Sequence, residues 1–234
     1  MSEQMVFKRY EIKYLVSREQ RDLLTDKIKD YMIPDKHGKN TILSLYLDTP
    51  DNLLIRRSLD KPVYKEKLRI RSYGLARDDT PVYLELKKKY DKVVYKRRVE
   101  MTYPDLKKYL CTGEIPYETQ IMKEIDYAMR RYGNISKKML LFYDREAFYC
   151  KDDPNIRLTL DNNILWRDSD LILDSSIYGT PLMNPDSSLL ELKVAGSIPL
   201  WLVNLLRTLK ISPTSFSKYG FAYKALKNKK SEVM

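Results

Sequence analysis

Three consecutive stretches decide the fold: residues 64–73 read YKEKLRIRSY, residues 82–89 read VYLELKKK and residues 92–101 read KVVYKRRVEM. Each stretch alternates charged and apolar residues, and the side chains of a β-strand alternate between its two faces. The alternation therefore predicts three long strands, each with a charged face and an apolar face. The loops between them are short and contain Gly74 and Asp91, so antiparallel hairpins are the expected connections.

The same pattern continues in three further predicted strands, over residues 6–16, 156–166 and 189–195. Their charged faces carry Arg9, Glu11 and Lys13; Arg157, Thr159 and Asp161; and Glu191 and Lys193. Strands are also expected over 41–48 and 138–149, and helices over 17–32 with Ser17 as cap, 51–59, 104–111, 117–132, 199–209 and 219–229. The pattern predicts an antiparallel α+β fold, and no domain boundary is visible in residues 1–234.

Two arrangements fit this alternation. One is an ordinary antiparallel sheet with its polar face in water and helices beneath it. The other is a tunnel with the charges inside and the apolar faces covered by helices. Arg and Lys dominate the charged positions, and cations on neighbouring strands repel one another unless an anion neutralises them. Three carboxylates, Glu11, Glu85 and Glu191, recur at mid-strand, where they could converge on a divalent metal. Together these features favour the tunnel around a polyanion.

The composition limits the chemistry. The formal net charge of +11 indicates an anionic partner. His37 is the single histidine, which argues against a His-activated nucleophile or a multi-histidine zinc site. Cys111 and Cys150 are too few for a disulfide framework, and neither a signal-peptide pattern nor an apolar run of membrane-spanning length is present. We expect a cytoplasmic protein.

Six short motifs, in order along the chain, resemble one known family. They are Arg9-x-Glu11-x-Lys13, Arg69-Ile70-Arg71, Glu85-Leu86-Lys87, Tyr143-Asp144-Arg145, Glu191-Leu192-Lys193 and Ser217-Lys218-Tyr219. The set resembles the triphosphate tunnel metalloenzymes (CYTH-like superfamily), and within them most closely the catalytic domain of the vacuolar transporter chaperone (VTC), a polyphosphate polymerase. The resemblance implies an eight-stranded antiparallel closed β-tunnel with a polar lumen and surrounding helices, formed by residues 1–234 as a single domain.

The resemblance also implies an activity: metal-dependent transfer of a phosphoryl group from ATP or another triphosphate to inorganic polyphosphate, with Mn²⁺ or Mg²⁺. The residues implied to act in catalysis are Arg69, Arg71, Lys87 and Arg145. The resemblance implies that Lys13, Lys96, Ser217 and Lys218 bind phosphate, and that Glu191 binds the metal. From their places on the charged strand faces, we also expect Arg9, Arg98, Arg157 and Lys193 to bind phosphate, and Glu11 and Glu85 to lie near the metal. The assignment by resemblance takes Lys96, and not Arg97 or Arg98, as the inward contact, and a register error of one residue would exchange them.

Two departures from the family pattern bear on the reaction. Hydrolytic tunnel enzymes open with Glu-x-Glu-x-Lys, but Arg9 stands at the first Glu, which argues against the two-metal hydrolase arrangement. Ser215 stands where the fungal polymerase pattern has a lysine, so one phosphate contact is missing.

Three other functions remain open. The first is a tunnel triphosphatase that hydrolyses inorganic or organic triphosphates, and the second is a non-catalytic polyphosphate sensor. The third, nucleic-acid binding, is disfavoured because carboxylates on the charged faces would repel a nucleic-acid backbone. A separate membrane protein is a possible partner by resemblance. The sequence leaves the oligomeric state open.

Overall fold

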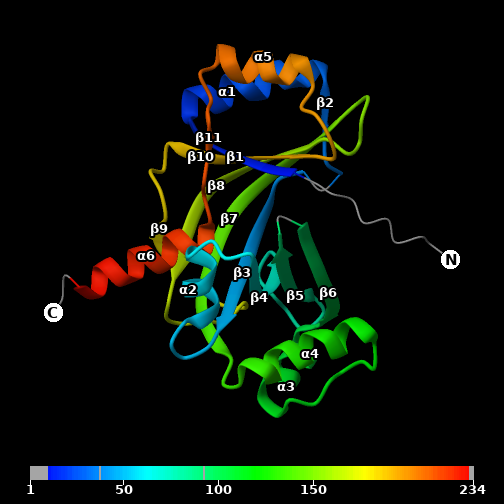
Figure 1. Ribbon diagram of the computed structural model, residues 1–234, viewed down its shortest axis with the longest axis vertical. Helices are drawn as coiled ribbons and strands as arrows, with labels where there is room; N and C mark the ends of the chain where they lie inside the picture. The colour runs from blue at the N-terminus through cyan, green and yellow to red at the C-terminus, as the bar shows by residue number, and fades with distance from the viewer. Residues whose placement is uncertain (1–9, 37, 92, 232–234) are drawn as a thin grey trace. The chain divides into compact units, whose positions relative to one another are not determined.

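The computed structural model describes residues 10–36, 38–91 and 93–231, and the chain divides into two compact units (Figure 1). Unit 1 comprises the described residues up to 40 together with 143–164 and 183–216. Unit 2 comprises 41–142, 165–182 and the described residues from 217 onwards. Each unit is therefore assembled from three segments of the chain.

Eleven described strands make up the sheet. They are β1 Tyr10–Ser17, β2 Met32–Pro34, β3 Asn40–Asp48, β4 Tyr64–Tyr73, β5 Pro81–Tyr90, β6 Val93–Thr102, β7 Ser136–Cys150, β8 Arg157–Arg167, β9 Thr180–Pro181, β10 Ser187–Val194 and β11 Pro213–Thr214. In unit 1 the order is β11-β1-β10-β8-β7, and in unit 2 it is β7-β3-β4-β5-β6. The pairs β1–β10, β10–β8, β3–β4, β4–β5 and β5–β6 are antiparallel.

The antiparallel α+β class is confirmed, but the closed eight-stranded tunnel is not. Among the described strands, no ladder joins β11 to β6, the two ends of the path. All eight expected strand ranges contain strands, and the sequence missed β2, β9 and β11, which have two or three residues each. Strands this short show no alternation that a sequence pattern could reveal.

The helices are α1 Arg18–Lys27, a 3₁₀ turn Ile28–Asp30, α2 Leu53–Leu59, α3 Tyr103–Thr112, α4 Gln120–Tyr132, α5 Leu200–Thr208 and α6 Lys218–Ser231. Ser17 caps α1 in a reciprocal capping box with Gln20, as expected from the sequence. The helix expected over 17–32 is too long, because it passes into the 3₁₀ turn and then into β2. Among the described residues, none of the helices has both the length and the hydropathy needed to cross a bilayer.

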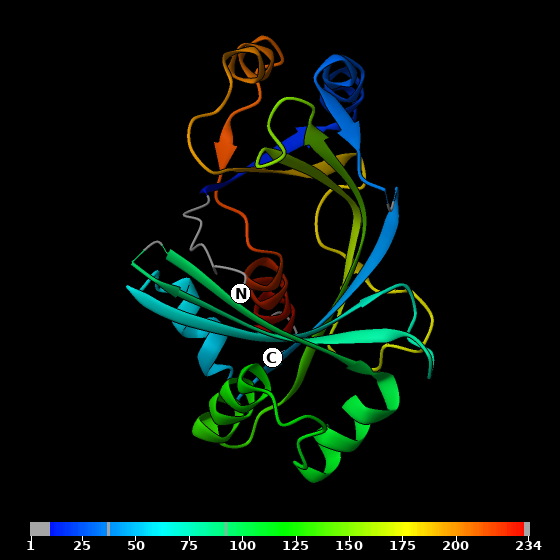
Figure 2. The same cartoon turned by 90° about the vertical axis from the view of Figure 1, so that its right-hand side faces the viewer.

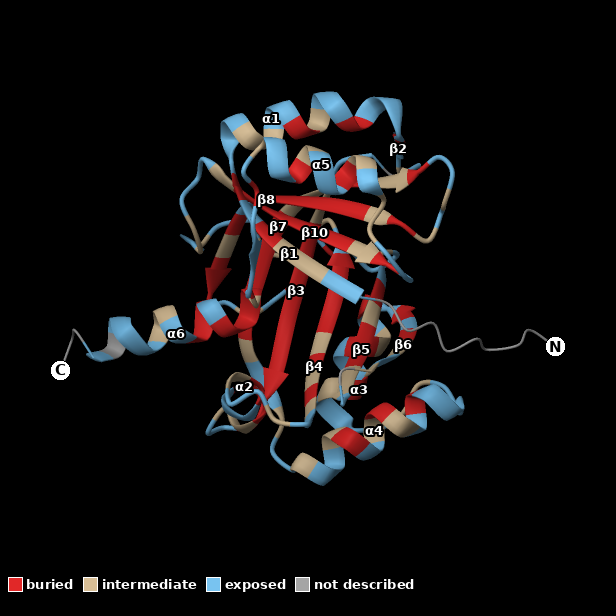
Figure 3. Ribbon diagram, turned by 45° about the horizontal axis from the view of Figure 1, so that its top comes forward, coloured by how far each residue is buried: buried red, intermediate tan, exposed pale blue. Residues whose placement is uncertain are grey.

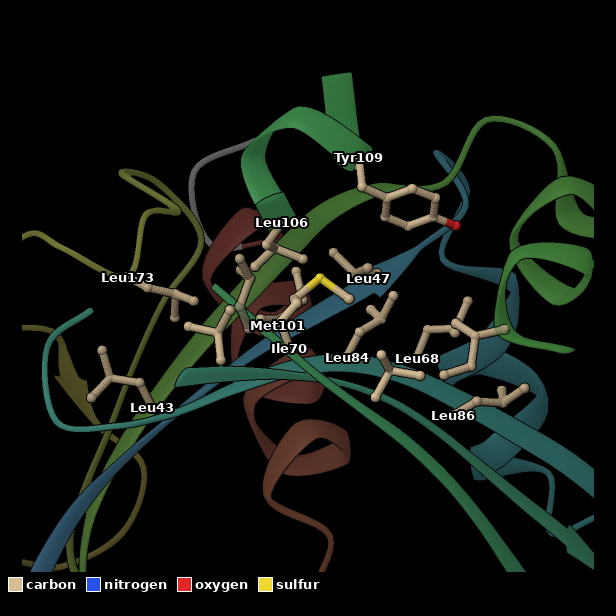
Figure 4. Packing of buried hydrophobic residues seen from close by; sticks show 14 of the residues in the cluster. Leu43, Leu47, Leu68, Ile70, Leu84, Leu86, Met101, Leu106, Tyr109 and Leu173 are labelled. Carbon is tan, nitrogen blue, oxygen red and sulfur yellow. The ribbon is translucent and has the colours of Figure 1, made fainter. Parts of the chain in front are cut away.

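Helices α3 and α4 cover the apolar face of the β4–β5–β6 meander in unit 2 (Figure 2). Leu68 and Ile70 of β4 and Leu84 and Leu86 of β5 are fully buried there. Figure 4 shows these side chains beneath Leu106 and Tyr109 of α3. The sequence prediction that helices bury the apolar faces is confirmed for this unit, and the opposite face of the same strands carries the charges.

Helices α1 and α5 cover the apolar face of unit 1. Leu24 of α1 and Leu202 of α5 pack in one cluster with alternate residues of β1, β8 and β10, including Tyr14, Leu158 and Leu192. In Figure 3 the strands β8 and β10 are largely buried, whereas both helices turn exposed residues outward. As in unit 2, the charged residues of these strands lie on the other face.

Candidate functional site

A cluster of basic side chains surrounds one buried carboxylate on the charged face of unit 2. Glu85 of β5 lies directly opposite Arg69 of β4 and Arg98 of β6. Its oxygens lie 2.5 Å from Arg69 Nε, 2.7 Å from Lys96 Nζ, 3.6 Å from Arg98 Nε and 4.0 Å from Arg71 Nε. We call these five residues the cationic cluster. Four cations around one carboxylate leave a local excess of positive charge, as a polyanion site requires.

The electrostatics hold Glu85 in its ionised form. Only 1% of its side chain is exposed, and such burial by itself would raise the carboxyl pKa. The charges of Arg69, Arg71 and Lys96 outweigh burial and hold the pKa of Glu85 well below its usual range. Burial lowers the pKa of Lys96, although Glu85 works against that shift. Glu85, which the sequence analysis placed near a metal ion, is therefore ion-paired within the cationic cluster.

The positive row continues along the same strands. Lys67 of β4 and Lys87 of β5 are directly opposite each other, and Lys96 of β6 is opposite Lys87. Lys67 Nζ donates a hydrogen bond to Ser217 Oγ at 3.0 Å. Burial, followed by repulsion from Lys89 and other lysines, lowers the pKa of the neighbouring Lys65. Like charges are therefore crowded on this face, as the sequence predicted.

Ser217 and Lys218 lie at the start of α6. Ser217 Oγ also accepts a hydrogen bond from the Gly220 backbone N–H at 3.2 Å, so the serine caps the helix. Lys218, the first residue of α6, is buried with 8% of its surface exposed. In unit 2 the structure therefore brings the Ser217 hydroxyl to the lysine end of the positive row.

Arg97 lies on the opposite face of β6 and does not belong to the cationic cluster. Arg97 Nε contacts a carboxylate oxygen of Glu124 in α4 at 2.6 Å, on the helix-covered side. Lys96 and Arg98 lie on the Glu85 side. This register resolves the ambiguity between Lys96 and Arg97.

A second cluster, in unit 1, has the opposite charge balance. Arg145 of β7 contacts both oxygens of Asp161 in β8, at 2.6 and 2.7 Å, and Glu191 of β10 at 3.4 Å. Lys13 of β1 lies 3.2 Å from Glu11 and 3.5 Å from Glu191. We call these five residues the mixed cluster. Burial opposes the charge of Arg145, but Asp161 raises the pKa of its guanidinium above the ordinary value.

The mixed cluster brings together two of the carboxylates that were expected to bind a metal ion. Among the described residues, no group of three His, Cys, Asp or Glu side chains is arranged to hold a metal ion by itself. Glu11 and Glu191 do converge, because both contact Lys13 Nζ. Mg²⁺ is commonly held by one or two carboxylates together with substrate phosphates. These two side chains are therefore the candidate donor pair for such an ion, and Lys13 lies beside them.

Two of the expected phosphate-binding residues that the structure describes, Arg157 and Lys193, belong to neither cluster as defined. Arg157 of β8 contacts Asp35 at 3.0 Å, and its guanidinium lies 4.9 Å from the ring centre of Tyr149. Lys193 of β10 is directly opposite Glu11, at the margin of the mixed cluster. Arg9 lies outside the described residues.

Two tyrosines extend the cationic cluster and were missed as site residues. The Arg98 guanidinium lies 3.5 Å from the ring centre of Tyr83 and 5.7 Å from that of Tyr73. Neither tyrosine is among the site residues expected from the sequence. The parity of Tyr83 with Glu85 and Lys87 was the available signal, because it places the tyrosine on the charged face.

Solved structures share this fold at low sequence identity. A proposed adenylate cyclase from Bacillus halodurans matches with a TM-score of 0.56 and 17% identity over 88% of this chain and 92% of the other. A proposed adenylyl cyclase from Hippeastrum, described as having a dominant triphosphatase activity, matches with a TM-score of 0.57 and 16% identity over 92% of this chain and 95% of the other. No curated protein matches the sequence significantly. These two likenesses show a shared fold.

The family model of the VTC domain matches residues 8–227 of the chain. Since this covers most of the 234 residues, the chain belongs to the VTC domain family. The resemblance drawn from the six motifs is confirmed.

Proposed function

We propose that this protein transfers the terminal phosphoryl group of a nucleoside triphosphate to a growing inorganic polyphosphate chain. The observation that carries the proposal is the cationic cluster, in which Arg69, Arg71, Lys96 and Arg98 surround a single carboxylate. Phosphoryl transfer needs little covalent chemistry from a protein, but it needs positioning and compensation of negative charge. Arginines provide paired donors for phosphate oxygens, and the lysines of the row add point charges.

The ionised, ion-paired state of Glu85 favours phosphoryl transfer to polyphosphate over hydrolysis. An attacking water has to lose a proton, and a general base works best when its pKa is near the working pH. Glu85 is ion-paired and its pKa is well below the usual range, so it is a weak base. The terminal oxygen of a polyphosphate acceptor is already ionised and needs no base. The cluster is therefore better suited to an anionic acceptor than to water.

A divalent ion, Mg²⁺ or Mn²⁺, supports the reaction in this proposal. Glu191, with Glu11, would hold it, and Lys13 and Arg145 would contact phosphate oxygens beside it. When bound, such an ion neutralises charge on bridged phosphate oxygens. Glu191 itself keeps Lys13 and Arg145 together, because both contact its carboxylate.

Hydrolysis of a triphosphate is the second candidate function. The Hippeastrum protein, which shares the fold, is described as having a dominant triphosphatase activity. In that case Glu191 or Glu85 would have to orient the water, and product would be released as free phosphate. A sensor that binds polyphosphate without turnover would form neither product.

One incubation separates these functions. The full chain is incubated with ATP and Mn²⁺ or Mg²⁺, and the products are resolved by size. We expect a ladder of polyphosphate chains together with ADP. Free phosphate without a ladder would contradict the proposal and indicate a triphosphatase. Unchanged ATP together with measurable tripolyphosphate binding would indicate a sensor without catalytic activity.

A further inference from the structure

The positive row of unit 2 changes character along its length. From the lysine end, the face carries Lys67 opposite Lys87, then Arg69 opposite Glu85, then Arg71 opposite Tyr83, and β4 ends on Tyr73. On β6 the same face runs from Lys96 through Arg98 to Glu100. Consecutive same-face residues are about 6.6–6.8 Å apart along a strand. One end of the row is therefore cationic, and the other is aromatic with a carboxylate.

Contacts hold the aromatic end in place. The Tyr73 and Tyr83 rings meet edge to face, with centroids 5.7 Å apart at 79°. Arg98 lies over the Tyr83 ring, and its Nη2 donates to the Tyr73 hydroxyl at 3.4 Å. Arg98 also reaches Glu85 at 3.6 Å, so one guanidinium connects the two tyrosines with the cationic cluster. Arg98 covers a face of the Tyr83 ring. Tyr73 is 42% exposed, so it is the tyrosine of this pair that a ligand can contact.

From this gradient we infer that Tyr73, supported by Tyr83 and Arg98, is a stacking platform for the base of a nucleoside triphosphate whose phosphates follow the row towards Lys67 and Lys87. The inference rests on the proposed function, because it assumes that the row binds phosphates. Aromatic side chains stack on the flat face of any base. The Glu100 carboxylate, on the residue directly opposite Tyr83, repels phosphate from this end. The ligand therefore has one orientation, with its base at Tyr73 and its terminal phosphate at the lysines.

The electrostatic setting of Tyr73 agrees with this placement. Burial would raise the pKa of its hydroxyl, but Arg71, followed by Arg98, outweighs burial and lowers it. Tyr73 thus lies within the positive field of the cationic cluster. A base stacked there would leave its phosphates in reach of Arg71 and Arg98.

Titration calorimetry with two ligands tests the inference. ATP has a base and inorganic tripolyphosphate has none, so Tyr73→Ala should weaken ATP binding about tenfold and change tripolyphosphate binding less than about twofold. Tyr73→Phe keeps the ring and should bind ATP within about threefold of the wild type. Tyr95→Ala is the matched control, because Tyr95 is also 42% exposed but lies on the opposite face of β6.

The outcomes separate this inference from the proposed function. Selective loss of ATP affinity in Tyr73→Ala, with Tyr95→Ala unchanged, supports the platform. An equal loss for both ligands, or no loss for ATP, overturns the platform while phosphate binding by the row still stands. A wild-type chain that binds neither ATP nor tripolyphosphate overturns both.

Discussion

The two units carry ion-pair clusters of similar size on the charged faces of their strands, yet the balance of charge is reversed. In unit 2 four basic side chains share Glu85, whereas in unit 1 three carboxylates share Lys13 and Arg145. An excess of cations attracts phosphate oxygens, and an excess of carboxylates attracts a metal ion. The same strand alternation therefore produces two clusters with opposite net charge.

The difference also assigns different roles to the acidic residues. Glu85 holds cations together that would otherwise repel one another, which is a positioning role. Glu191 bridges Lys13 and Arg145 in an environment with further carboxylates, where a divalent ion adds favourable charge.

Glu85→Gln removes the shared anion of the cationic cluster. Deleting one partner of a buried charge network leaves the others uncompensated, so the free energy of unfolding should fall by about 3–5 kcal/mol. Glu124→Gln removes the partner of Arg97 on the outer, partly exposed face, and should cost about 0–1 kcal/mol. Urea denaturation of each variant measures both values.

The Glu85 variant also reports on ligand binding. Saturating tripolyphosphate should restore more stability to Glu85→Gln than it adds to the wild type, because the ligand replaces the missing negative charge. Equal stabilisation of the two proteins would contradict the assignment of excess positive charge to this cluster.

Arg98→Ala and Arg97→Ala compare adjacent residues on opposite faces of β6. Arg98 lies beside Glu85 and the tyrosines, so its loss should lower the rate of product formation from ATP by about 10²–10³-fold. Arg97 contacts Glu124 in α4, and its loss should change the rate by less than about twofold. Similar rates for the two variants would mean that the charged face of β6 does not contact the substrate.

Glu191→Gln tests the metal preference of the mixed cluster. We expect the Mn²⁺ concentration for half-maximal activity to rise at least about tenfold, because one of two converging carboxylates loses its charge. For Glu85→Gln that concentration should stay the same, whatever the maximal rate. A metal titration of activity checks both, and a shift in Glu85→Gln alone would reverse the two assignments.

Alkaline pH should weaken polyanion binding modestly. Burial lowers the folded-state pKa of Lys96 below 10.5, so the cation is lost at a lower pH than in an ordinary lysine. Tripolyphosphate affinity should therefore fall a few-fold as the pH rises through that folded-state value. The pKa of Lys96 is lower in the folded state than in the unfolded state, so protonated Lys96 destabilises the folded state. This destabilisation disappears as the pH rises to the unfolded-state pKa.

Lys96→Arg is the control for the pH effect. An arginine stays protonated throughout this range, so the decline in affinity should be smaller in the variant. Identical pH profiles in calorimetric titrations would show that Lys96 does not contact the ligand.

The face of each long strand could be predicted from the sequence, because the period of two is a local property. Lys96 and Arg98 share a face with Glu85 for this reason, and Arg97 does not. The partners of each carboxylate could not be predicted in the same way. Glu85 and Glu191 occupy equivalent positions in Glu-Leu-Lys motifs, but their surroundings depend on pairings between strands distant in sequence. Those pairings decide which one is enclosed by cations.

The two units differ in how far apart along the chain their paired strands lie, and this difference affects the order in which they fold. The meander β4 to β6 and its covering helices α3 and α4 form one unbroken stretch, residues 64–132, joined by short connections. Pairing β1 with β10 joins residues such as Glu11 and Lys193, which are far apart in the chain. Local contacts form faster than distant ones. During synthesis, the cationic hairpins would therefore form long before the ribosome releases the strand that completes unit 1.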